Sequence, residues 1–267
     1  MHRSLAVAVF SLLSILPVSL LAQQHTQSQP APVRDPQAVS ILTQSLNAAG
    51  GADALAAMRD FTASGKITYF WTEKGETGTV TVKSRGMKQF RLDATLSDGV
   101  LTAVVNNGTS RIKETDGTTR QLINQHADNI GALYLPFAEI AAALTDPSIA
   151  ITDLGTATEN GQTTHGIRLQ RTFSTLDDSQ QTRAKMTQRE IFIDSRTFMV
   201  VRTRDLATTR SNPVPSVVHD LIFSNYQQLN GVLFPYSISE ALNHQQVVAM
   251  QFDTVKFNNG LGDGDFQ

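Results

Sequence analysis

The chain has 267 residues, of which 40% are hydrophobic and only 17% charged, and its formal net charge is -2 at pH 7. This balance, without clustered Lys and Arg, argues against a nucleic-acid-binding surface. Cysteine is absent, which excludes a disulfide framework, thiolate metal ligands and a cysteine nucleophile.

Residues 1–22 have the pattern of a secretory signal peptide. A short basic start, MHRS, precedes the apolar run LAVAVFSLLSILPVSLLA. Cleavage after Ala22 would leave a soluble exported protein, which we expect in the periplasm. A retained membrane anchor is the alternative, although Pro17 interrupts the apolar run.

The rest of the chain divides into a lead-in and one domain. Residues 23–34, QQHTQSQPAPVR, are rich in Gln, Pro and Ser, and this composition predicts a flexible segment. Residues 35–267 are enough for one large β-rich domain, and we expect a single domain.

Two short helices are predicted at the start of this domain. Asp35 can cap a helix that has Pro36 in its first turn, and apolar residues then recur on one face. The Gly50-Gly51 pair ends this helix, and a second helix is predicted over 52–60. Their apolar faces must dock on another part of the fold.

From Phe61 the apolar residues alternate, which is typical of a half-buried strand. The turn signals EKGE, SRGM, SDGV, NNGT and TDGT then separate strands near 76–84, 87–96, 99–106 and 108–115. NNGT contains a formal glycosylation sequon at Asn107, which we interpret as a hairpin turn. A helical insertion over 122–144, with Pro136 in a first turn, interrupts this meander. Further strands are predicted at 150–155, 165–173, 189–194, 198–206, 218–229, 233–242 and 245–257.

The last predicted strand changes its apolar parity. Met250 and Phe252 occupy even positions, whereas Val255 and Phe257 occupy odd ones. This change predicts a bulge or strong bend between Phe252 and Val255. We expect Phe266 to fold back beneath the sheet as a plug.

Local pairing of about eleven strands predicts a mainly β (α+β) fold. The helices cannot be crossovers, because the strands pair with their sequence neighbours. We therefore expect an incomplete antiparallel β-barrel with short helices that cap its concave face.

The sequence contains no recognisable catalytic or metal-binding motif. No histidine pair has metal-ligand spacing, and G-x-S-x-G, phosphate-loop and dinucleotide patterns are absent. The acidic pairs Asp177-Asp178 and Asp263/Asp265 are interpreted as solvated loop residues. We predict that the protein is not an enzyme and needs no cofactor or metal.

A curved sheet with a helical cap can leave an apolar cavity, although an ordinary packed core is the alternative. The residues predicted to line a lipid-binding cavity share the inward face of a strand or of the helical insertion. They are Ile67, Tyr69, Trp71, Val80, Val82, Phe90, Leu92, Phe137, Ile140, Leu144, Leu221, Phe223, Met250 and Phe252.

The stretch TVTVKSRGMKQFRLDATLSDGVLTAVVNNGTSRIKETDG, residues 79–117, resembles the periplasmic lipoprotein carrier (LolA-like) and lipoprotein-sorting family. The closing segment NYQQLNGVLFPYSISEALNHQQVVAMQFDTVKFNNGLGDGDF and the opening segment LNAAGGADALAAMRDFTASGKI are also similar to that family. The resemblance implies an incomplete barrel with a helical lid over a hydrophobic cavity. It also implies that Arg85, in KSRG, locks the lid, although Gly86 stands where the family has proline. Arg91 has the simpler interpretation of a surface charge.

The resemblance implies a non-catalytic carrier that binds lipid acyl chains or lipoproteins for transfer across the periplasm. Its partners would be these ligands and membrane-bound donor and acceptor proteins, and we expect a monomer. One alternative is an envelope sensor or scaffold that binds a protein partner with the same fold. A hydrolase is a further alternative, which would require His165 or His219 to meet a serine or a carboxylate.

Overall fold

The structure is a computed structural model that describes residues 32–71, 75–121, 134–159, 161–173, 184–185, 187–207 and 217–267. These residues belong to one compact unit, Ala31–Gln267. The predicted signal peptide, residues 23–31, residues 122–133 of the insertion, Asp177-Asp178 and most of the loop at 207–216 lie outside the described residues.

The described elements are three α-helices, one short 3-10 helix and thirteen strands. The helices are α1 (Pro36–Ala48), α2 (Gly51–Ala57), α4 (Pro136–Thr145) and the 3-10 helix η1 (Asp263–Phe266). The first six strands are β1 (Asp60–Tyr69), β2 (Glu76–Arg85), β3 (Gln89–Leu96), β4 (Gly99–Asn106), β5 (Thr109–Lys113) and β6 (Thr119–Gln121). The others are β7 (Ile149–Glu159), β8 (Gln162–Arg171), β9 (Arg189–Asp194), β10 (Val200–Ala207), β11 (Val217–Leu229), β12 (Val232–Leu242) and β13 (Gln245–Phe257).

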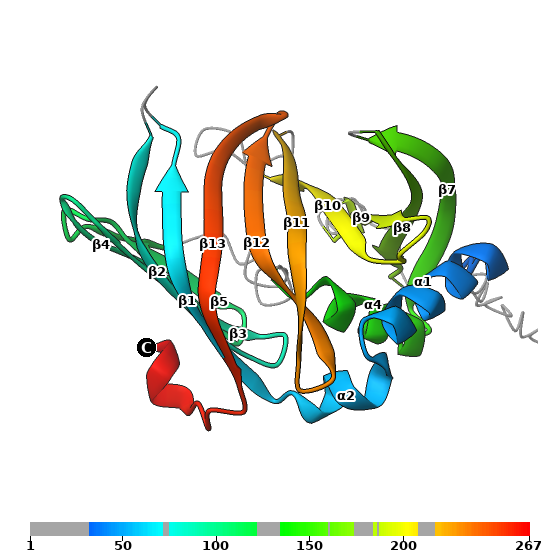
Figure 1. The fold of residues 1–267 in the computed structure, drawn as a ribbon, viewed down its shortest axis with the longest axis horizontal. Coiled ribbons are helices and arrows are strands. Elements are labelled where there is room, and N and C mark those ends of the chain that lie inside the picture. The colour runs from blue at the N-terminus through cyan, green and yellow to red at the C-terminus, as the bar shows by residue number, and fades with distance from the viewer. Residues whose placement is uncertain are drawn as a thin grey trace, which may run out of the picture. The chain divides into compact units, whose positions relative to one another are not determined.

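The strands form one open antiparallel sheet, which confirms the predicted mainly β class (Figure 1). Their order is β6-β5-β4-β3-β2-β1-β13-β12-β11-β10-β9-β8-β7, so two meanders meet where β1 pairs with β13. The sheet has thirteen strands rather than about eleven. One addition is β6, whose three residues are too few to show alternation.

Helix α1 begins and ends as the sequence predicts. The Asp35 carboxylate accepts hydrogen bonds from the N–H groups of Gln37 and Ala38, which would otherwise lack partners. Gly50 follows the helix with φ +123°, and a Cβ there would lie 2.1 Å from the carbonyl oxygen of Gly231. Glycine therefore lets the end of α1 approach the turn between β11 and β12.

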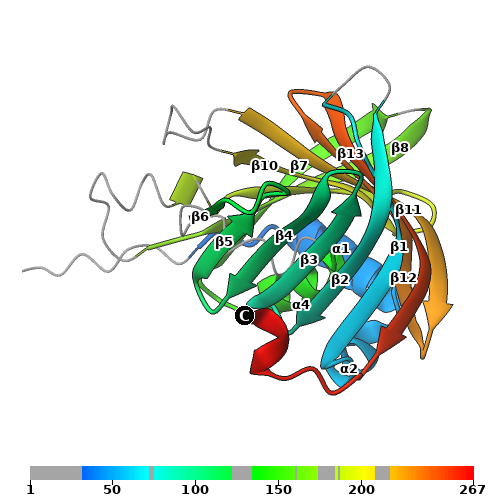
Figure 2. The same cartoon turned by 90° about the vertical axis from the view of Figure 1, so that its left-hand side faces the viewer.

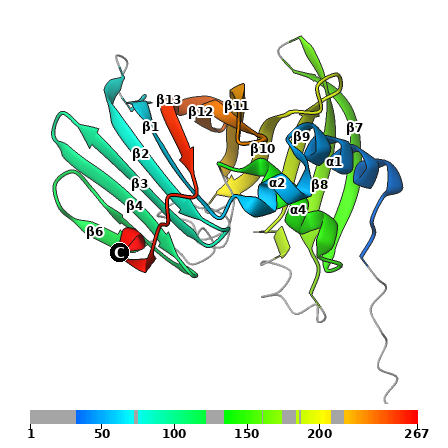
Figure 3. The same ribbon diagram turned by 60° about the horizontal axis from the view of Figure 1, so that its bottom comes forward.

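The three α-helices lie together on one side of the sheet, beside β8–β10 (Figure 3). Side chains from α1 and α4 join the inward residues of the strands in one hydrophobic cluster. Strand β2 of the first meander alternates: Val80 and Val82 are buried, and the neighbouring Thr79 and Thr81 are not. This face of the sheet is the predicted concave face under the helices.

The last strand contains the predicted bulge. Gly65 of β1 pairs with Phe252, but Ser64 pairs with Thr254, so Asp253 is an extra residue in β13. Phe252 and Val255 are both buried despite their opposite parity, because the bulge changes which positions face inward.

The C-terminal residues pack on the other face of the sheet. Figure 2 shows η1 in front of β3 and β4, with α1 and α4 behind the strands. Phe266 is 1% exposed and Val104, on the outward face of β4, is 3% exposed. Phe266 thus plugs the convex face and not the predicted cavity.

Candidate ligand-binding site

Twelve of the fourteen predicted cavity residues are buried in one cluster. Ten come from the first meander and from β11 and β13, and the helical members Phe137 and Ile140 have no exposed surface. The face of each strand was thus correctly predicted for these residues. Their own side chains pack against one another, so the structure shows a core here, and ligand binding by these residues stays a prediction.

Trp71 and Leu144 differ from the other twelve. Trp71 follows the end of β1, its side chain is 57% exposed, and its ring stacks on Tyr69 at a centroid distance of 4.2 Å. Trp71 therefore lies outside the buried cluster, because β1 ends at Tyr69, and its place in a lipid-binding cavity stays a prediction. Leu144 is partly buried and packs against the edge of the cluster.

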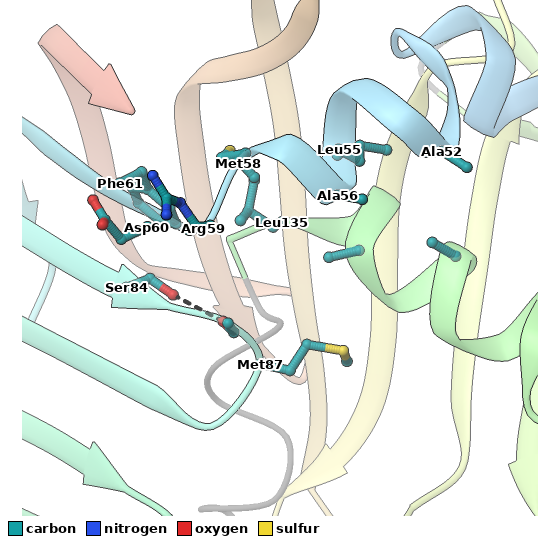
Figure 4. A pocket seen from close by; sticks show the side chains of 13 residues that line it. Ala52, Leu55, Ala56, Met58, Arg59, Asp60, Phe61, Ser84, Met87 and Leu135 are labelled. Atoms are coloured by element: carbon teal, nitrogen blue, oxygen red, sulfur yellow. Dashed lines mark hydrogen bonds between the residues drawn. The ribbon is translucent and has the colours of Figure 1, made fainter. Parts of the chain in front are cut away.

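A pocket of about 240 Å³ lies between the helices and one end of the first meander (Figure 4). Leu55 and Met58 line it from the region of α2, Leu135 from the start of α4, and Met87 from the turn between β2 and β3. None of the fourteen predicted residues lines this pocket. The only sequence signal for it was the apolar side of the second helix, which needed a docking surface.

The pocket has a short polar margin formed by Arg59, Asp60 and Ser84. The Asp60 carboxylate accepts hydrogen bonds from the N–H groups of Asn259 and Gly260, at 2.6 and 3.1 Å. Asp60 therefore fastens the C-terminal segment. The arrangement favours an apolar ligand, because small and aliphatic side chains form most of the lining.

A line of charged side chains runs across the helix-covered face from α4 to β12. Arg189 Nε lies 2.9 Å from Glu139 Oε1, and Arg189 Nη2 lies 3.0 Å from Asp205 Oδ2 as an ion-pair contact without hydrogen-bond alignment. His219 Nδ1 is 2.7 Å from Asp205 Oδ1, and His219 Nε2 is 3.3 Å from Glu240 Oε1. We call these five residues the ionic chain. Sequence analysis missed it because its members come from five separate elements.

His219 meets two carboxylates, as the hydrolase alternative required of a histidine, but both ring nitrogens are occupied. Burial lowers the pKa of His219, but the hydrogen bonds to Asp205 and Glu240 outweigh it and raise the pKa to about 10. The ring is therefore a cation at neutral pH and is not available as a general base. This geometry gives the hydrolase alternative no support at His219.

Arg34 secures the other end of α4. Its guanidinium donates hydrogen bonds to the carbonyl oxygens of Ala143, Leu144, Asp146 and Ile149, at 2.9–3.1 Å. A cation at this position satisfies carbonyls that a helix end leaves without partners. Arg34 also pairs with Ile151 of β7, so the predicted flexible segment is ordered at its last residue.

Arg85 lies on the convex face, with its guanidinium bonded to the Asp263 carboxylate, the Leu261 carbonyl and Gln89 Oε1. Nearby, Lys83 Nζ is 2.7 Å from Asp265 Oδ1 and Arg91 donates to the Gln267 carbonyl oxygen. Asp263 is exposed, as the solvated interpretation expects, but both aspartates lie in η1 rather than in a loop, and each forms an ion pair with a basic residue of β2. The lid-locking role of Arg85 stays a prediction, and its hydrogen bonds within the described residues involve the C-terminal segment and β3.

No protein-family model and no curated protein sequence matches the chain. Its structure is similar to that of a domain from Vibrio parahaemolyticus that is named as an outer membrane lipoprotein-sorting protein domain. The two share 11% sequence identity, with a TM-score of 0.52. That match covers 86% of this chain and 95% of the other. The protein has a LolA-like fold.

Two further solved structures have a similar fold. A LolA superfamily protein from Nitrosomonas europaea matches with 10% identity and a TM-score of 0.51, over 86% of this chain and 97% of the other. A DUF1329 family protein from Desulfovibrio piger has the same identity and TM-score, over 86% and 96%. At these identities the likeness concerns the fold. Within the described residues, no helix is long and apolar enough to span a bilayer.

Proposed function

We propose that the protein is an exported, non-catalytic carrier that binds lipid acyl chains or lipoproteins beneath its helices and transfers them across the periplasm. The pocket at α2 and α4 is the observation that carries this proposal. It opens between helices and an apolar sheet face, in a fold shared with a domain named for lipoprotein sorting.

The size of the pocket requires movement of the helices during binding. A volume of about 240 Å³ is below the ~300–1,000 Å³ of typical ligand pockets, so a long acyl chain would not fit in it. Displacement of α4 would uncover Phe137, Ile140 and the strand residues they cover. Each methylene buried there contributes roughly 0.8 kcal/mol to binding.

Native mass spectrometry of the purified mature protein, with extraction of bound lipid, tests this function. We expect acyl species to co-purify and fluorescent fatty acids to bind. Ala138→Trp, which fills the pocket, should weaken binding at least tenfold, whereas Ala157→Trp on exposed β7 should not. A protein without bound lipid that also ignores the fluorescent probes would contradict the proposal.

A protein partner is the second candidate function, and the β1–β2 hairpin favours it. Phe70 and Trp71 are 37% and 57% exposed at the end of β1. Exposed neighbouring aromatic residues are typical of binding surfaces. If a partner binds here, cross-linking from a photoreactive residue at position 70 should give one discrete product in envelope extracts, and Trp71→Ser should remove it.

A further inference from the structure

Helix α4 has one charged residue, Glu139, and its carboxylate is buried against the sheet. Oε1 contacts Arg189, but Oε2 has no hydrogen-bond partner. A buried carboxylate with one unsatisfied oxygen is costly, and a proton removes most of that cost. Glu139 therefore joins α4 to the sheet through a contact that depends on its protonation.

Arg189 does not compensate for this burial fully, because it also pairs with Asp205. Burial raises the pKa of Glu139, the Arg189 cation opposes this, and the Asp205 carboxylate adds to it. Arg189 itself is 2% exposed and keeps its charge. Of these two residues, Glu139 is therefore the one that we expect to gain and lose a proton.

The other charged groups around α4 leave this assignment unchanged. The thirteen residues of α1 include no charged side chain, and Asp53 of α2 is exposed. Arg202 and Arg204 of β10 contact Asp220 and the Phe192 ring. Within the described part of the chain, other titratable groups near α4 are Arg34, Asp146 and Arg171 at its C-terminal end, Tyr134 before its first residue, and Tyr226 against Phe137.

We propose that Glu139 and the rest of the ionic chain form a pH-dependent latch, which holds α4 closed on the sheet when Glu139 is protonated and loosens when it ionises. In the closed helix the carboxyl group is buried, whereas in an open helix it is in water. A proton therefore binds more tightly to the closed form. Acid tightens the latch, and a rise in pH favours opening.

Hydrogen exchange of the full mature protein, measured without added ligand, tests this latch. After correction for intrinsic exchange rates, the protection of residues 136–145 should rise as the pH falls from 8 toward the ordinary glutamate pKa of 4.5. One proton changes the closed-to-open ratio by at most about tenfold per pH unit. We expect at least a threefold rise relative to α1.

Glu139→Gln supplies the decisive comparison, because its amide can still contact Arg189 but cannot ionise. Protection of α4 should then be high and independent of pH. The exposed Asp53→Asn should keep the slope of the wild type. A wild type without a slope, or a Glu139→Gln variant that retains it, would overturn the proposal.

A direct titration covers the case in which Glu139→Gln does not fold. Carbon-13 NMR of labelled glutamate side chains in the wild type should show one carboxyl group that titrates above 4.5. If every folded-state glutamate titrates at or below 4.5, there is no such latch. The role of the latch in ligand release rests on the proposed function. Hydrogen exchange and the titration both concern α4 alone, so they would remain valid even if the protein bound no lipid.

Discussion

At the scale of single residues, Gly65 shows how a bulge constrains its neighbour. The extra residue in β13 brings that strand close to β1, and a Cβ on Gly65 would lie 2.0 Å from the carbonyl oxygen of Gln251. Because the obstacle is backbone, it cannot rotate away. Glycine is therefore required at the point where β13 bends.

Gly65→Ala should lower the free energy of unfolding by about 2 kcal/mol or more, because the strands must separate to admit the methyl group. Urea unfolding at neutral pH measures this change. Gly264→Ala is the matched control, since a Cβ at that position meets nothing within 4 Å. Equal stability of the two variants would show that the strands accommodate the methyl group.

At the scale of elements, α4 is held at both ends by arginines that are distant in sequence. Arg34 contacts carbonyls at its C-terminal end, and Arg189 contacts Glu139 in its first turn. Phe137 also packs on Tyr226, whose hydroxyl donates to the Val200 carbonyl oxygen. Movement of α4 must therefore break at least one of these contacts.

Arg34→Ala should loosen the C-terminal end of α4, because four carbonyl groups lose a charged donor. We expect a loss of about 2 kcal/mol in stability and faster hydrogen exchange in residues 141–149. Arg34→Lys should recover only part of the effect, since an ammonium group lacks the planar fork. Arg111→Ala, an exposed arginine on β5, is the control, and an equal effect there would exclude a specific role for Arg34.

Sequence analysis predicted elements with local signals and missed contacts between distant ones. Alternation and turn residues located most strands, and the parity change located the bulge at Asp253. The ionic chain has no such signal, because each of its residues is an isolated charge in an otherwise ordinary strand or helix. Likewise, the ion pairs of Asp263 and Asp265 form only because the C-terminal segment returns to the convex face, and the sequence carries no signal for that return.

At the scale of the whole molecule, the ionic chain makes stability depend on pH. The pKa of His219 is about 10 in the folded protein and 6.5 in the unfolded reference. Its contribution is therefore complete below pH 6.5 and is lost as the pH rises toward 10. Asp194 and Asp146 act in the opposite direction, since their lowered pKa values make stability fall in acid.

His219→Gln should destabilise the protein at pH 7 and flatten the loss of stability between pH 7 and 10. In the wild type, the free energy of unfolding should fall by at most about 1.4 kcal/mol per pH unit in that window. Chemical denaturation at several pH values measures the slope. The exposed His244→Gln should keep it, and a slope that survives in His219→Gln would assign the effect to another group.

The pairing of β1 with β13 has a consequence for how the chain acquires its structure. Phe61 lies opposite Phe257, so the ladder at the middle of the sheet joins residues almost 200 positions apart, whereas the other ladders between the described strands join strands that are consecutive in the chain. Each meander can form as soon as its own residues are available, but the central ladder must wait for the last strand. Non-local pairing of this kind is slow, because a long loop must close before its contacts form. During folding, the two half-sheets would each present an unpaired edge until β13 arrives, and this interval is when the chain most needs protection from aggregation.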